Sequence, residues 1–112
     1  MDAFSSVTPE KVRTAVQKIV EAARPRRIIL FGSYVRGTTN RNSDLDVLVI
    51  MDGDVENPRK ESVRLRRALK GIMMPMDILV VSPKIVEELA ESPGLVYREA
   101  LRNGKIVYES AA

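Results

Sequence analysis

Apolar and polar residues follow one another along this chain in blocks whose spacing changes from that of a helix to that of a strand. From Thr8 to about Ala23, apolar residues recur at i, i+3, i+4 and i+7, which is typical of a helix with one buried face. Threonine, proline and glutamate at its start are the usual signals of a helix amino terminus. After Pro25, the short apolar run Arg27 to Phe31 predicts a strand that is buried on both faces.

The rest of the chain predicts two more buried strands, with helices between and after them. The expected elements are a strand over 44–51, a helix from about 59 to 70 closed by Gly71, a strand over 76–81, helices over 84 to about 90 and about 94 or 95 to 102, and an edge strand over 105–108. This order predicts a single α/β (α+β) domain over residues 1–112, with a central sheet of three to four strands.

Composition limits the chemistry that such a domain can perform. The 112 residues include no histidine and no cysteine, which excludes Ser-His and Cys-His nucleophiles and His-ligated zinc. Catalysis would have to use carboxylates, Lys, Arg, Tyr, Ser and metal. No apolar run approaches the roughly 20 residues that span a bilayer, and the start of the chain does not resemble a secretory signal. We therefore expect a cytoplasmic protein without a membrane segment.

Positive charge exceeds negative charge, with a net charge of +3. The basic residues gather in two places, at Arg24, Arg26 and Arg27 and then at Arg59, Lys60, Arg64, Arg66, Arg67 and Lys70. Such clusters suit an anionic ligand or an acidic partner without choosing between them. Nucleic-acid binding is disfavoured, because aromatic residues that could stack on bases do not interleave the basic run.

Three aspartates stand at the starts of the second and third expected strands. Asp44 and Asp46 are two apart, so their side chains share one face of the second strand, and Asp77 has the matching place in the third. One such acid is commonly structural. If the two strands are neighbours, three carboxylates converge, and two unit charges 4 Å apart repel by about 4 kcal/mol at an effective dielectric near 20. A divalent cation would remove this cost, and an all-oxygen ligand set suits Mg²⁺, with Mn²⁺ as the alternative.

A second candidate element follows the first expected strand. Gly32 and Ser33 turn the chain from that strand into a short helix, with backbone N–H groups and a hydroxyl that phosphate oxygens could approach closely. Arg36 lies one turn on and could add positive charge, although solvent exposure explains it equally well. Taken alone, a Gly-Ser pair is an ordinary strand-to-turn signal.

With these residues assembled, the chain resembles the minimal nucleotidyltransferases, an antitoxin family within the polymerase-beta-like nucleotidyltransferase superfamily. The resemblance is carried by Gly32-Ser33, ten intervening residues, Asp44-Leu45-Asp46 and the later strand aspartate Asp77. It extends loosely over nearly the whole chain. It implies a small mixed sheet flanked by helices.

The resemblance also implies an activity. Nucleoside monophosphate would move from a nucleoside triphosphate, ATP as the expected donor, to a hydroxyl, with release of pyrophosphate. Asp44, Asp46 and Asp77 would hold two Mg²⁺ ions, Asp77 would serve as the general base, and Gly32, Ser33 and Arg36 would contact the phosphates.

The same resemblance implies a HEPN-domain toxin as the partner, with a tyrosine of that toxin as the acceptor. Two alternatives remain open: a binding module that neutralises the partner by contact alone, and an enzyme that modifies small molecules. Base preference and oligomeric state, whether homo-oligomer or hetero-oligomer, cannot be read from the sequence.

Overall fold

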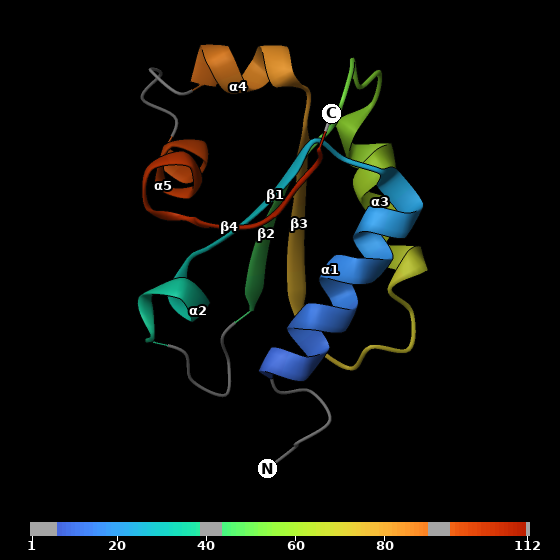
Figure 1. Cartoon of the computed structure of the whole chain (residues 1–112), viewed down its shortest axis with the longest axis vertical. Coiled ribbons are helices and arrows are strands. Elements are labelled where there is room, and N and C mark those ends of the chain that lie inside the picture. Colours follow the sequence, from blue (N-terminus) through green and yellow to red (C-terminus); the bar gives the residue numbers. More distant parts are fainter. Residues whose placement is uncertain (1–6, 39–43, 90–94, 112) are drawn as a thin grey trace.

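The computed structural model describes residues 7–38, 44–89 and 95–111, and these residues form helices packed on both faces of one sheet (Figure 1). The elements in chain order are α1 (Pro9–Ala23), β1 (Arg27–Phe31), α2 (Ser33–Arg36), β2 (Leu45–Ile50), α3 (Pro58–Ala68), β3 (Met76–Val81), α4 (Pro83–Leu89), α5 (Leu95–Asn103) and β4 (Lys105–Glu109). In this described part of the chain, no helix is both long enough and apolar enough to cross a membrane.

The sheet has the strand order β3-β2-β1-β4. Strand β1 pairs antiparallel with β2 and with β4, whereas β2 and β3 are parallel and are connected through α3. The prediction of a small mixed sheet flanked by helices is therefore confirmed. Since β2 and β3 are parallel, their amino-terminal ends lie side by side, and the aspartates near both strand starts are brought close together.

Two apolar layers hold the sheet between the helices. On one face, the larger cluster contains Val12, Ala15 and Ile19 of α1, Leu65 of α3, Leu69 at the α3 cap, and Leu45, Val47 and Val49 of β2. On the other face, Ala100 of α5 packs with a smaller cluster that includes Phe31, Leu48 and Ile50. Alternate residues of each central strand thus enter different layers, which explains why β1 and β2 are apolar almost throughout.

The observed boundaries differ from the expected ones by small amounts. Thr8 caps α1 as expected, since its hydroxyl accepts a hydrogen bond from the Lys11 N–H at 3.2 Å. Strand β2 begins at Leu45, so Asp44 immediately precedes the strand instead of opening it. Helix α3 ends at Ala68, and Gly71, with φ +103°, lies in the turn beyond it and not at its cap. The expected helix ends at about 90 and 94 lie outside the described residues.

Candidate active site

The parallel pairing of β2 with β3 brings the predicted carboxylates together at the amino-terminal ends of these two strands. Asp46 and Asp77 are register partners. The Leu45 N–H donates to the Pro75 carbonyl at 2.9 Å, which fixes the two strand starts against each other. Asp44 lies one residue before β2 and is exposed. The assumption that the two strands are neighbours is confirmed, because β3 lies beside β2 in the sheet.

Asp46 is the member of this group whose ionisation is perturbed. Partial burial raises the pKa of Asp46 above its ordinary value of 3.8, and the negative charges of Asp77 and Asp44 raise it further. The positive charge of Arg36 acts in the opposite direction. Asp44 and Asp77 therefore both lie within electrostatic reach of Asp46, and the charged form of Asp46 carries a cost that a cation would relieve.

Gly32 lies directly against this carboxylate. Its φ is +78°, which is unfavourable for any residue with a side chain. A Cβ placed on it would lie 3.1 Å from Asp46 Cγ and well inside 3.0 Å of Asp46 Oδ2. Glycine at this position thus lets the Asp46 carboxylate and the turn between β1 and α2 approach each other, so the Gly32-Ser33 turn and Asp46 lie in one region of the molecule.

Ser33 begins α2 in this turn, and Arg36 ends that short helix. Ser33 is half-buried, and no side chain caps the helix, because its cap position is Gly32. The Arg36 guanidinium donates to Glu99 of α5 at 3.1 Å, and Glu99 also accepts from Asn103 at 3.0 Å. The structure therefore pairs the Arg36 guanidinium with a carboxylate of α5. Sequence reasoning missed Glu99, because a pairing across 63 positions leaves no local pattern.

Arg66 is a second site neighbour that sequence reasoning did not identify. Its guanidinium lies 3.5 Å from Asp77 Oδ1, and both side chains are more than half exposed. The only signal in the sequence is the basic run along α3, which suits an anionic ligand or an acidic partner. The structure gives Arg66 an anionic partner within the chain.

The three aspartates fit a divalent cation in chemistry and charge, although they do not form a closed ligand group. Among the described residues, no three acidic side chains are gathered closely enough to hold a metal ion. The available donors are carboxylate oxygens, which Mg²⁺ and Mn²⁺ prefer. Burial and the two neighbouring acids raise the pKa of Asp46, so a bound cation would favour its charged form. For Asp77 to join a shared cation, its carboxylate would have to leave Arg66.

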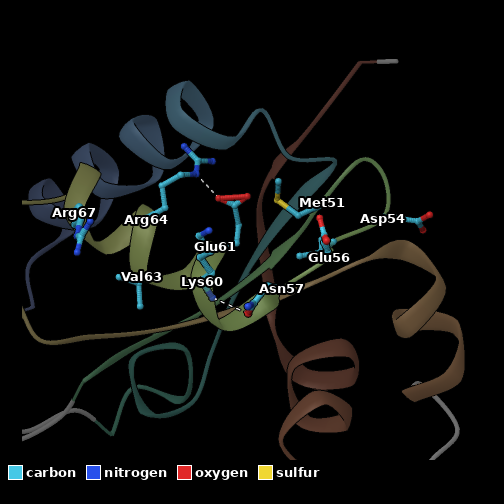
Figure 2. A pocket seen from close by; sticks show the side chains of 10 residues that line it. Met51, Asp54, Glu56, Asn57, Lys60, Glu61, Val63, Arg64 and Arg67 are labelled. Carbon is cyan, nitrogen blue, oxygen red and sulfur yellow. Dashed lines mark hydrogen bonds and ion pairs between the residues drawn. The ribbon is translucent and has the colours of Figure 1, made fainter.

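A larger hollow lies at the opposite end of β2 and was not expected from the sequence. Figure 2 shows this groove, with a volume of about 940 Å³, between the loop that follows β2 and helix α3. Its lining residues are Met51, Asp54, Val55, Glu56, Asn57, Lys60, Glu61, Val63, Arg64 and Arg67. Acids and bases are mixed along it, and Glu61 pairs with Arg64. Unlike the aspartate site, the groove shows no group of carboxylates converging from two strands.

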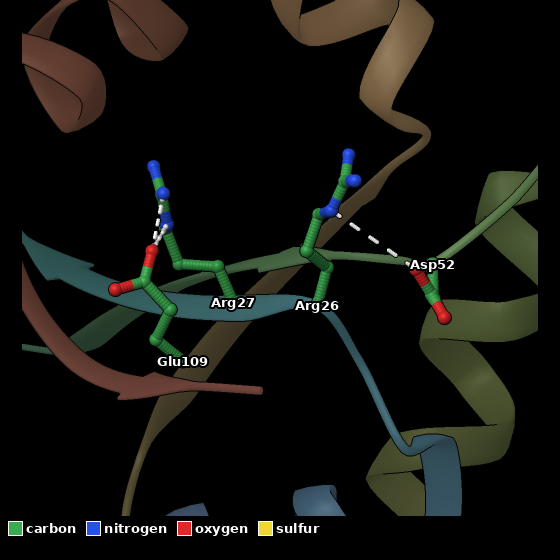
Figure 3. Close-up of polar contacts among 4 residues, drawn as sticks. All are labelled: Arg26, Arg27, Asp52 and Glu109. Carbon is green, nitrogen blue, oxygen red and sulfur yellow. Dashed lines mark hydrogen bonds and ion pairs between the residues drawn. The ribbon is translucent and has the colours of Figure 1, made fainter. Parts of the chain in front are cut away.

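Ion pairs occupy the same end of the sheet as the groove. Figure 3 shows Arg27 of β1 paired with Glu109 of β4, and Arg26 paired with Asp52. The Arg26–Asp52 pair is the longer contact, at 4.0 Å. Four of the residues in the two basic clusters, Arg26, Arg27, Arg64 and Arg66, thus have acidic partners within the chain. The basic clusters offer less unpaired charge to an external anion than the sequence suggested.

Comparison with known proteins identifies the family. The sequence profile described as "Nucleotidyltransferase domain" matches residues 9–110. No curated protein matches the chain. Among solved structures, a protein from Sulfolobus solfataricus assigned as a nucleotidyltransferase superposes with a TM-score of 0.62 at 18% identity, covering 89% of this chain and 78% of that one.

Two toxin-antitoxin structures are also similar. One, solved with AMP-PNP, has a TM-score of 0.55 at 24% identity and covers 88% of this chain and 73% of that one. A mutant of the toxin-antitoxin MntA-HpeT has a TM-score of 0.52 at 20% identity, with 94% and 76% covered. The likeness in each case is one of fold, and it agrees with the resemblance drawn from the motif. This chain belongs to the nucleotidyltransferase domain family and has its polymerase-beta-like fold.

Proposed function

We propose that this protein is a metal-dependent nucleotidyltransferase that moves AMP from ATP to a hydroxyl group, and that the acceptor is a tyrosine of a HEPN-type partner toxin. The observation that supports the activity best is the register of β2 and β3. It sets Asp46 opposite Asp77, with Asp44 one residue before β2 and Gly32 against the Asp46 carboxylate. A fold that needed only to bind a partner has no physical reason to pay for this repulsion.

Each residue then has a defined task. Asp44, Asp46 and Asp77 would hold Mg²⁺, which when bound neutralises phosphate charge and lowers the pKa of an attacking hydroxyl. Gly32 and the first N–H groups of α2 would contact the β- and γ-phosphates of the nucleotide, together with the Ser33 hydroxyl. Asp77 accepts the proton of the acceptor hydroxyl. A new bond forms between that oxygen and the α-phosphorus, the bond from the α-phosphorus to the pyrophosphate oxygen breaks, and pyrophosphate leaves.

The choice of donor and partner is supported by the similar structures. Two of them are toxin-antitoxin complexes, and one of these contains AMP-PNP, an analogue of ATP. The MntA-HpeT mutant carries two aspartate-to-glutamate substitutions two positions apart, the same spacing as Asp44 and Asp46. These features support an antitoxin that uses a similar pair of acids on a nucleotide. The HEPN class and the tyrosine acceptor follow from the family resemblance.

The test is transfer of label from ATP to the purified partner in Mg²⁺. ATP labelled at the α-phosphate should label the partner, whereas ATP labelled at the γ-phosphate should not, because pyrophosphate leaves. Asp44→Ala and Asp46→Ala should abolish labelling. Asp54→Ala, which removes an acid from the groove at the other end of β2, should retain it.

The outcomes separate the proposed function from its rivals. Label from the γ-phosphate would indicate a kinase and contradict nucleotidyl transfer. A stable complex that forms without label, and that forms equally with Asp44→Ala, would establish a binding module. Label transfer that survives both aspartate substitutions would show that the site is elsewhere. Substitution of partner tyrosines by phenylalanine then identifies the acceptor.

A further inference from the structure

Arg66 and Asp77 lie on different faces of the sheet. Asp77 alternates with Ile78 and Val80, which belong to the cluster under α1 and α3, so the Asp77 side chain is directed to the face that carries Asp46. Helix α3 packs on the other face through Leu65. The 3.5 Å contact from Arg66 to Asp77 therefore reaches around β3, which is an edge strand.

This contact holds the Asp77 carboxylate against a guanidinium beside the edge strand β3. It supplies positive charge to one of three mutually repelling acids, which stabilises the arrangement without a cation. Asp46 and Asp77 are register partners, yet no three acids in the described part of the chain are gathered for a metal, which agrees with an Asp77 carboxylate held by Arg66.

We propose that Arg66 is a positioning residue for Asp77, which holds this carboxylate at the edge of β3 until the carboxylate exchanges the guanidinium for a divalent cation. The inference rests on the proposed function, because it requires that the aspartates bind a cation. Arg66 then competes with the cation for Asp77, and it sets how readily the site is completed. The exchange also frees a guanidinium beside the site for another anion.

The matched control is Arg59, which lies seven residues before Arg66 on the same helix and is exposed. Seven residues correspond to about 10 Å of helix, close to the Debye length of about 8 Å at 0.15 M salt. Arg59→Gln thus removes the same charge from the chain while acting on the aspartates only through screened, long-range electrostatics. Arg66→Lys keeps a positive charge at the site itself.

The experiment is calorimetric titration of the full chain with Mn²⁺ at 0.15 M salt. Arg66→Gln should lower the Mn²⁺ Kd about two- to fivefold, as expected for loss of an exposed ion pair that competes with the metal. Arg59→Gln and Arg66→Lys should stay within about 1.5-fold of the unmodified protein. In an Asp77→Asn background, Arg66→Gln should have no further effect, because the competing pair is already absent.

Each other result has a definite meaning. Equal Mn²⁺ affinity in Arg66→Gln and Arg59→Gln would overturn the role of Arg66 and leave the metal site intact. A tightening that persists in the Asp77→Asn background would also overturn it, since the arginine would then act through its general field. Mn²⁺ binding that is absent, or unaffected by Asp46→Ala, would refute the metal site of the proposed function and this inference with it.

Discussion

The two ends of β2 differ in what they could do. At the amino-terminal end, exposed or half-buried acids at the starts of two strands lie beside a glycine turn. At the carboxyl-terminal end, a groove of about 940 Å³ is lined by acids and bases, some of them already paired. The groove thus offers volume, whereas the aspartate end offers an acid whose charged form is disfavoured. Since perturbed ionisable groups cluster at functional sites, the proposed chemistry is assigned to the carboxylates and not to the groove.

The largest contrast between the two ends should appear in catalysis. Asp44→Asn and Asp46→Asn should each lower kcat/KM for nucleotidyl transfer by about 10³-fold or more, because a lost carboxylate weakens both metal binding and charge neutralisation. Asp54→Asn, in the groove, should change it less than about twofold. Steady-state rates of pyrophosphate release would measure this. Comparable losses at Asp46 and Asp54 would erase the distinction between the two ends.

Glycines at the two ends provide the next contrast. Gly32→Ala places a methyl group against Asp46 Oδ2 at a φ of +78°, and should cost about 2–4 kcal/mol of unfolding free energy and about 10²-fold in activity. Gly53→Ala, in the loop before α3, meets no atom within 4 Å and should change stability by less than about 0.5 kcal/mol. Urea denaturation of the two variants measures the change in unfolding free energy, and the rate of pyrophosphate release measures the change in activity. Tolerance of alanine at position 32 would contradict the close approach.

The raised pKa of Asp46 predicts that the site costs stability when no metal is present. Since the folded state holds this proton more tightly than the unfolded chain, the stability it contributes is present below pH 3.8 and is lost as pH rises through the raised value. In EDTA at pH 7, Asp46→Asn should therefore raise Tm by about 1–3 °C, a gap that closes as the pH falls.

Adding Mg²⁺ should reverse this order, because a cation that binds only the folded protein stabilises the form that retains its carboxylate. Differential scanning fluorimetry in EDTA and in Mg²⁺ measures both states. An unmodified protein that melts above Asp46→Asn in EDTA at pH 7 would show that the carboxylates do not repel as inferred.

The smallest contrast concerns two exposed ion pairs. Glu99→Gln breaks the pair with Arg36 near the site, and Glu109→Gln breaks the pair with Arg27 at the far end of the sheet. Each should change stability by about 0.2–1 kcal/mol. Only Glu99→Gln should alter KM for the nucleotide, by about threefold, because it frees Arg36. Identical KM values in the two variants would remove Arg36 from the phosphate site.

Most of the fold followed from local pattern. The apolar stripe of α1, the Thr8 cap and the doubly buried run of β1 are determined by neighbours within a few residues, and each was found where expected. Boundaries shifted by one or two residues where end positions compete, as at Asp44 and Ala68. The order β3-β2-β1-β4 could not be derived from periodicity, because strand pairing depends on contacts between distant residues.

By itself, the sequence determined which groups are available: three aspartates at strand starts, a Gly-Ser turn, and neither histidine nor cysteine. Only the tertiary structure decided how these groups meet. Parallel pairing sets Asp46 opposite Asp77, and close packing sets Gly32 against Asp46. Ion pairs between different elements join Arg66 to Asp77 and Arg36 to Glu99. Composition fixes the kinds of charge a chain carries. The distances between those charges, which set how strongly they interact, arise only when strands far apart in sequence become neighbours.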